Sequence, residues 1–158
     1  MSTVATIRDL TWERVLRTRF EPDALAELAE WVWANAVPLA RSSDRPTDPR
    51  PRWIGGSLNE AVSGPRCFLR EWPIDERMAR HTHPNGMLLM VLTGRLRVCE
   101  GARAQGQVRI LDPGDRLIRV AESGGFDHFP HLLRPLTPTL SFHLYSDAPS
   151  RGRSISED

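Results

Sequence analysis

His81-Thr82-His83-Pro84-Asn85-Gly86 opens the stretch of the chain that decides its fold. On an extended strand, two histidines separated by one residue point to the same face. A group of turn residues follows at once and leads into an apolar segment, Met87–Leu92, that ends at Thr93-Gly94. The pattern predicts a strand that carries two histidines, a tight turn and a buried second strand.

Short apolar segments separated by turn residues continue on both sides of this stretch. The clearest turns are Asp112-Pro113-Gly114-Asp115 and Ser123-Gly124-Gly125. Short strands at such regular spacing are typical of an all-β sandwich or barrel. The expected strands are Arg66–Trp72, Met78–His83, Met87–Leu92, Arg95–Glu100, Gln107–Leu111, Arg116–Val120, His131–Arg134 and Thr139–Tyr145.

The first third of the chain has a helical pattern instead. One helix is expected after Thr11, a possible N-cap, and a second begins near Pro22. Trp31 and Trp33 flank the apolar stripe of the second helix, and we expect both to pack it against a sheet. The stripe is formed by Leu25, Leu28, Ala29 and Val32.

Residues Pro38–Pro51 are rich in proline, serine and aspartate, which predicts a loop. Two helices alone would make a poor independent domain, so this loop is not read as a domain boundary. The sequence therefore predicts a single domain, residues 1–158. It would consist of a helical extension and loop at 1–52 and a β-barrel at 53–150.

The charge of the chain gives no indication of a polyanionic partner. The formal net charge is +1, and the basic residues, all of them arginine, are scattered. We therefore expect no nucleic-acid or membrane binding. Cys67 and Cys99 stand in strand-like segments and are expected to be buried, reduced thiols. Without a signal peptide or a long apolar segment, the chain is expected to be cytoplasmic, as a monomer or homodimer.

All five histidines lie in the β half, and the pair His81 and His83 predicts a metal site. Imidazole nitrogens from one strand face can converge on a single ion. Neutral imidazole binds zinc, copper, iron and nickel alike, so the ligand type does not identify the metal. His128 and His131 are the two candidates for a third ligand.

The order of these features resembles the cupin superfamily over roughly Arg66 to Ser146. The strand with two histidines, the apolar strand closed by glycine and the Pro113-Gly114-Asp115 turn carry this resemblance. It implies a double-stranded β-helix, a jelly-roll barrel, with two histidines and usually a glutamate from the first motif and a third histidine from the second. Met87 occupies the glutamate position, so the resemblance implies a site of three histidines.

Ser141, His143 and Tyr145 resemble the Ser-x-His-x-Tyr motif of the cysteine dioxygenase branch of cupins, the thiol dioxygenases. Their alternation places them on one strand face, where hydroxyl, imidazole and phenol can form a hydrogen-bonded chain. The resemblance implies ferrous iron, Fe(II), held by three histidines. The spacing to His143 favours His128 over His131 as the third.

The same resemblance suggests the substrate pocket. Trp72 matches a pocket tryptophan, and Arg70 shares its strand face. No arginine aligns with the carboxylate-binding arginine of that branch, and Arg52 is displaced from it, so Arg70 is the expected anchor. Met87, also expected to line the pocket, replaces a cysteine that cross-links to the tyrosine in vertebrate-type enzymes, so Tyr145 is expected to be unmodified.

The expected function is oxidation of a small thiol by O2 to a sulfinate. Cysteine, a mercapto acid and a larger thiol remain open as substrates. Two alternatives also remain open. One is a different metal-dependent cupin enzyme, an oxygenase that carries out carbon–carbon cleavage or tailors a cysteine-derived metabolite, or a decarboxylase. The other is a non-catalytic cupin that binds a small ligand.

Overall fold

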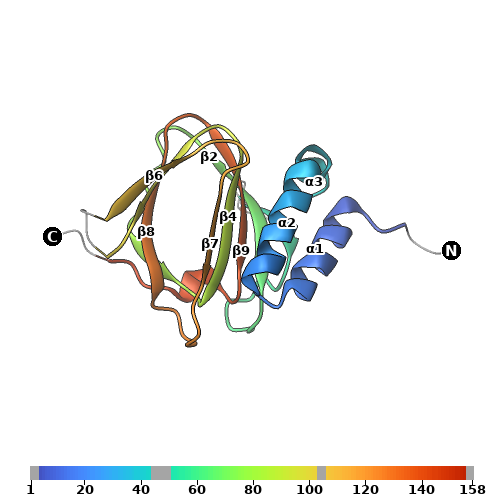
Figure 1. The fold of residues 1–158 in the computed structure, drawn as a ribbon, viewed down its shortest axis with the longest axis horizontal. Coiled ribbons are helices and arrows are strands. Elements are labelled where there is room, and N and C mark those ends of the chain that lie inside the picture. Colours follow the sequence, from blue (N-terminus) through green and yellow to red (C-terminus); the bar gives the residue numbers. More distant parts are fainter. Residues whose placement is uncertain (1–3, 44–50, 103–105, 156–158) are drawn as a thin grey trace.

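The computed structural model describes residues 4–43, 51–102 and 106–155. Two antiparallel sheets face each other, and three helices lie against the outside of one of them (Figure 1). Among the described residues, no helix combines the length and the apolar character that a membrane span requires.

Within the described residues, the two sheets contain nine strands. The larger sheet has the order β1-β2-β9-β4-β7 and the smaller one β3-β8-β5-β6. Strands far apart in sequence, such as β2 and β9 or β3 and β8, therefore lie side by side. This is the predicted double-stranded β-helix. The larger sheet consists of β1 (Pro51–Gly55), β2 (Arg66–Trp72), β9 (Thr139–Tyr145), β4 (Gly86–Thr93) and β7 (Arg116–Val120). The smaller sheet consists of β3 (His81–His83), β8 (His128–Pro135), β5 (Leu96–Glu100) and β6 (Gln107–Leu111).

Four predicted strands, β2, β6, β7 and β9, have the observed bounds. Two others differ in ways that matter for the site: β3 is shorter than predicted, and β8 begins at His128 rather than His131. Strand β1 was not predicted, because a segment that begins with proline and ends with glycine has the composition of a loop. Proline is nevertheless tolerated as the first residue of an edge strand, and β1 is such an edge.

The alternation of side chains along the larger sheet separates two apolar cores. One core lies between the sheets and includes Trp72, Leu89 and Leu117. The other lies between the outer face and the helices and includes Leu69, Leu88 and Phe142. The helical extension therefore covers one face of the barrel wall. The expected packing of the second helix against a sheet is confirmed, whereas the face that it covers was not predicted.

The first helix, α1 (Ile7–Thr18), begins five residues earlier than predicted. Thr6 is its N-cap and forms a reciprocal capping box with Asp9. Thr11, the predicted cap, lies inside the helix, and its hydroxyl donates to the Ile7 carbonyl over 2.7 Å. The prediction was wrong because a threonine caps a helix only from the position just before the first turn, where its side chain can accept from free backbone N–H groups. Thr6 has that position and Thr11 does not.

The other two helices are α2 (Pro22–Ala34), as predicted, and α3 (Ala36–Ser42). Helix α3 occupies the first part of the predicted loop Pro38–Pro51, so that prediction was wrong there. Pro38 is tolerated because it stands in the first turn, where a backbone N–H has no helical partner. Residues 44–50 of the predicted loop lie outside the described residues. A short 3-10 helix, Pro149–Arg151, follows β9.

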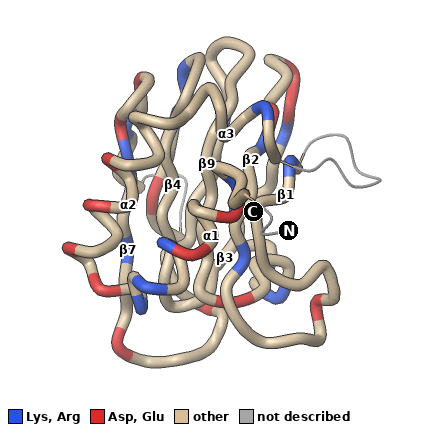
Figure 2. The backbone as a smooth tube through the Cα atoms, turned by 90° about the vertical axis from the view of Figure 1, so that its right-hand side faces the viewer, with Lys and Arg blue, Asp and Glu red and all other residues tan. Residues whose placement is uncertain are grey.

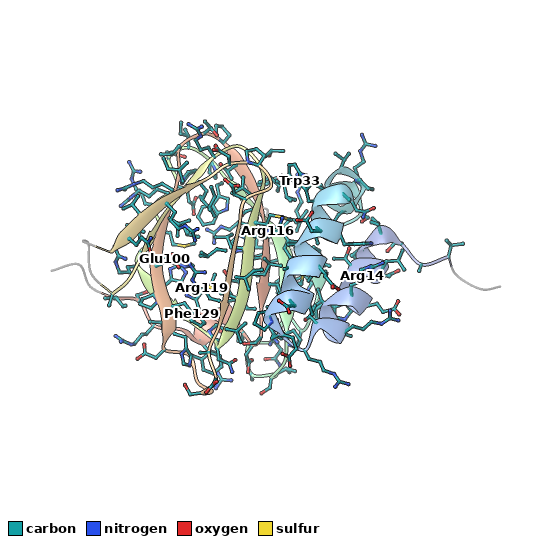
Figure 3. All side chains as sticks on the ribbon, viewed as in Figure 1. Arg14, Trp33, Glu100, Arg116, Arg119 and Phe129 are labelled. Carbon is teal, nitrogen blue, oxygen red and sulfur yellow. The ribbon has the colours of Figure 1, made fainter. Side chains whose placement is uncertain are left out.

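Polar contacts also join the helices to each other and to the barrel. The Arg116 side chain of β7 donates to the Ala26 carbonyl over 3.2 Å and pairs with Glu30, both on α2. The Arg14 guanidinium lies 4.7 Å above the Trp31 ring. Trp31 packs against the outer core as expected, whereas Trp33 is 43% exposed. Figure 3 shows Arg116 facing α2. In Figure 2, positive and negative residues are interspersed over the visible face.

Gly55 lies directly against the Trp12 ring of α1. A Cβ atom added there would lie 2.1 Å from Cδ2 and 2.2 Å from Cε3 of the Trp12 ring. A side chain at this position would therefore push the indole, and α1 with it, away from β1.

Gly55→Ala is expected to lower the free energy of unfolding by about 1–3 kcal/mol, the usual cost of overpacking. Chemical denaturation followed by circular dichroism measures the change. Gly124→Ala is the matched control, because an added Cβ at Gly124 has no heavy atom within 4 Å. Equal stabilities for the two variants would contradict this account of how α1 packs.

Candidate metal centre

Three histidines converge at one end of the smaller sheet. His81 and His83 come from β3, and His131 comes from β8, where it is the register partner of His81. One nitrogen from each ring lies within 4.8 Å of the others. The ring centroids are 4.0 to 5.0 Å apart. Among the described residues, this is the one group of this kind that could hold a metal ion.

The third histidine of this group is His131, not the predicted His128. His128 stands at the start of β8, and its Nε2 lies 2.9 Å from the Gly124 carbonyl oxygen, away from the group. His131 is only 1% exposed. The prediction relied on the spacing to His143 and placed His128 before the strand. The structure extends β8 back to His128 and turns His131 inward.

Side-chain alternation along β8 explains why His128 and His131 differ. The two are three residues apart and so point to opposite faces of the strand, and Phe129, His131 and Leu133 point into the barrel. Phe129 has a φ of 46°, in the left-handed region, and the register between β3 and β8 is irregular here. For a residue with a Cβ, this conformation costs roughly 1–2 kcal/mol. The Phe129 carbonyl accepts a 2.9 Å hydrogen bond from Nδ1 of His83 and so orients a histidine of the group.

Backbone hydrogen bonds select the tautomers of the first two histidines. Nδ1 of His81 donates to the Ala79 carbonyl over 2.8 Å, and Nδ1 of His83 donates to the Phe129 carbonyl. In a neutral imidazole the other nitrogen then carries a lone pair. Nε2 of both rings is thus the atom available to a metal, and such a backbone acceptor is typical behind a metal-bound histidine.

The buried nitrogens of the group fit a metal ion. Nε2 of His83 and both ring nitrogens of His131 have no hydrogen-bond partner among the described residues. Burial lowers the pKa of His83 to about 3, with a further contribution from His81. Burial, followed by the neighbouring His83 and His81, also holds the pKa of His131 well below its ordinary value. The rings are therefore neutral, which is the form that binds metal.

The predicted polar chain on β9 is present and is longer by one residue. Ser141 Oγ lies 2.6 Å from Nε2 of His143, and Nδ1 of His143 lies 3.0 Å from the Tyr145 hydroxyl. Trp72 Nε1 donates to Ser141 Oγ over 2.8 Å. The chain therefore runs from Trp72 through Ser141 and His143 to Tyr145.

Two facts together give these hydrogen bonds their direction. An indole N–H can only donate, so Ser141 accepts from Trp72. Ser141 is fully buried, and the one acceptor near its hydroxyl among the described residues is Nε2 of His143, whereas Tyr145 lines a cavity; the Ser141 hydroxyl hydrogen therefore goes to His143. His143 then carries its hydrogen on Nδ1 and donates it to the Tyr145 oxygen. The Tyr145 hydroxyl hydrogen is left for a partner outside the chain. Burial raises the pKa of Tyr145, so its hydroxyl stays protonated.

Tyr145 links this chain to the histidine group. Its ring stacks on His83, with centroids 5.7 Å apart and planes 11° apart. A cavity of about 240 Å³ lies beside both, lined by His81, Tyr145 and Trp72 among others. The space suits a small molecule.

Arg70 lines the same cavity, as predicted. Its guanidinium lies 4.1 Å above the Trp72 ring, and its Nη2 donates to Glu76 over 3.0 Å. The pairing with Glu76 was missed, because that carboxylate comes from the turn after β2. Arg52 faces the helices instead: it pairs with Glu71 and donates to the Ala40 carbonyl of α3.

Met87 is not among the residues that line this cavity. It is fully buried and is the register partner of Tyr145 on β4. Its side chain packs in the inner core together with Tyr145. Met87 thus supports Tyr145 from the neighbouring strand, and the prediction of a pocket-lining residue was wrong. Cys67 and Cys99 are buried free thiols, as expected.

No family model and no curated protein matches this chain. Solved structures with a similar chain path include a cupin superfamily protein from Desulfitobacterium hafniense, with 14% identity, 61% of this chain, 74% of that chain and a TM-score of 0.48. A protein with a double-stranded β-helix domain from Klebsiella pneumoniae is 17% identical, and the match covers 72% of this chain and 90% of that chain with a TM-score of 0.48. A salicylate 1,2-dioxygenase from Pseudaminobacter salicylatoxidans is 21% identical, and the match covers 57% of this chain and 24% of that chain with a TM-score of 0.44. Each of these is a likeness of fold.

The geometry predicts different results for the two competing histidines. His131→Ala is expected to weaken metal binding by about tenfold or more, because it removes one of three ligands. His128→Ala is the matched control and is expected to keep the affinity of the unaltered chain. Titration with Co(II), followed by its absorption spectrum, measures both. Loss of binding in His128→Ala with normal binding in His131→Ala would restore the sequence-based assignment.

Proposed function

We propose that this chain is a non-heme Fe(II) dioxygenase that oxidises the sulfur of cysteine or a related small thiol to a sulfinate. The observation that carries the proposal is the joining of two features at one small cavity. The group of three neutral histidines reaches the cavity through His81, and the directed hydrogen-bond chain that ends at Tyr145 lines it as well. The ligands for the ion would be His81, His83 and His131.

Ferrous iron at the three histidines would supply the activation of O2 for this reaction. The thiol sulfur takes up both oxygen atoms of O2, so the balance needs no external reductant. All three histidines are neutral and leave the charge of a divalent ion uncompensated, which favours an anionic ligand such as a thiolate. Neutral imidazole ligands are also common for iron.

Tyr145 has the role of a hydrogen-bond donor toward the bound substrate. Its hydroxyl hydrogen is free because His143 already donates to its oxygen, and its raised pKa keeps that hydrogen in place. Trp72 and Ser141 hold His143 in the tautomer that this arrangement requires. A fixed donor in a buried site stabilises developing negative charge more strongly than water does.

Arg70 and Trp72 form the wall that would receive the substrate's head group. The guanidinium stacked on the indole is held in place and can bind a carboxylate through two parallel hydrogen bonds. Glu76 now occupies one of its donors. A substrate carboxylate would therefore share Arg70 with Glu76 or displace it, which makes the charge of the head group a determinant of affinity.

Anaerobic loading with ferrous iron, followed by oxygen-uptake measurements with a panel of small thiols, tests the proposal. Stoichiometric iron, thiol-dependent uptake and a sulfinate product are expected. Tyr145→Phe keeps the ring and is expected to lower kcat about 100-fold, the scale of a lost proton donor, with unchanged iron content. Uptake without sulfinate would indicate another cupin oxygenase. No iron and no uptake would leave a ligand-binding module.

The anchor is tested by Arg70→Met, which is expected to raise the KM for a thiol that bears a carboxylate by about tenfold or more. The loss of a charge-assisted hydrogen bond, worth about 1.5–3 kcal/mol, is the reason. Cysteamine, which lacks the carboxylate, should show a smaller change. Arg52→Met is the control and should leave the KM unchanged, because Arg52 lies on the opposite face of the sheet. An unaltered KM in Arg70→Met would remove Arg70 from the site.

A further inference from the structure

We propose that Arg119 is a positioning residue that holds the Glu100 carboxylate away from the metal, so that the centre keeps three histidine ligands and no carboxylate. This inference rests on the metal centre of the proposed function. It concerns an ion pair between the two sheets that the sequence did not indicate.

Glu100 is the register partner of His131. The two residues lie opposite each other on β5 and β8, and opposed residues of an antiparallel pair point to the same face, with Cβ atoms about 4.5–5.5 Å apart. Leu96 and Val98, which share the alternation of Glu100, belong to the core between the sheets. Glu100 therefore points into the barrel, directly beside a histidine of the group.

Arg119 reaches Glu100 from the opposite sheet. Nε and Nη2 of Arg119 each donate to a different carboxylate oxygen of Glu100, both over 2.9 Å. A third donor, Nη1, binds the Ile118 carbonyl over 2.8 Å and fixes the guanidinium. Figure 3 shows Glu100 and Arg119 facing each other between the sheets, near Phe129.

The pair is partly shielded from water, since the side chains of Glu100 and Arg119 are 18% and 32% exposed. A two-pronged arginine–carboxylate contact in such surroundings is stronger than an exposed ion pair. Arg119 is also the register partner of Met87, which in turn is the partner of Tyr145. The ion pair is thus fixed to the same sheet that carries the polar chain.

Without Arg119, Glu100 would be a carboxylate beside a divalent ion with neutral ligands. Carboxylate oxygen is a normal ligand for such ions, and the attraction is strong at a site with little water. As a fourth protein ligand, Glu100 would occupy a coordination position of the ion. It would also supply the negative charge that the substrate thiolate is proposed to supply. By engaging both oxygens of Glu100, Arg119 keeps that position for the substrate.

The test compares Co(II) affinity and absorption in the unaltered chain, Arg119→Met, Glu100→Gln and the double variant. Arg119→Met is expected to bind Co(II) about tenfold more tightly or better, with a changed visible spectrum. Glu100→Gln and the double variant should both resemble the unaltered chain, because neither has a carboxylate to offer. Arg119→Lys keeps the positive charge but loses the two-pronged contact, so its Co(II) affinity should lie between those of the unaltered chain and Arg119→Met. Circular dichroism shows whether Arg119→Met folds, and if it does not, Arg119→Lys takes its place in the test.

Equal affinity and equal spectra in Arg119→Met, or in a folded Arg119→Lys if the first variant does not fold, would overturn this inference and leave the metal centre standing. A tightening that persists in the double variant would overturn it too, because Glu100 would then not be the added ligand. No binding of Co(II) to the unaltered chain would overturn the metal centre itself and the inference with it.

Discussion

Strand β9 pairs with β2 on one side and with β4 on the other, and the alternation of its side chains organises the rest of the molecule. Phe142 and Leu144 point outward, where three helices cover them, and Ser141, His143 and Tyr145 point into the barrel. A strand buried on both faces can carry three polar side chains only if they satisfy one another. They do so through a chain that starts at Trp72 on the neighbouring strand.

Hydrogen-bond satisfaction separates the two polar groups inside the barrel. Every member of the β9 chain has a partner. The order of donors follows from the indole N–H at its start and from the buried Ser141 hydroxyl, whose hydrogen has only His143 as an acceptor among the described residues. The histidine group is different, since buried nitrogens of His83 and His131 have no partner among the described residues. Burial holds these rings neutral and leaves unpartnered nitrogens within 4.8 Å of one another, an arrangement that a bound cation would relieve.

Much of the fold could be predicted from local patterns. Strands β2, β6, β7 and β9 were recognised from their residues and turns, and α2 from its proline and apolar stripe. Strand β1 and helix α3 were missed because their prolines and polar residues are typical of a loop. Their stability depends on pairing with β2 and on packing against the other helices. The packing of α2 against a sheet was predicted from its apolar stripe, but the face that the helices cover was not, since nothing local states which surface an apolar helix meets.

For the site, the sequence by itself determined which residues share a strand face. The pairing of His81 with His83 and the row Ser141, His143 and Tyr145 both follow from the period of two along a strand, which is a local property. Only the tertiary structure decided that His131 rather than His128 completes the group, that Glu76 faces Arg70 and that Arg119 holds Glu100. Each of these contacts joins side chains from separate segments. Which side chains meet there depends on strand register, on the irregularity at Phe129 and on the facing of two sheets, and these exist only once the chain has folded.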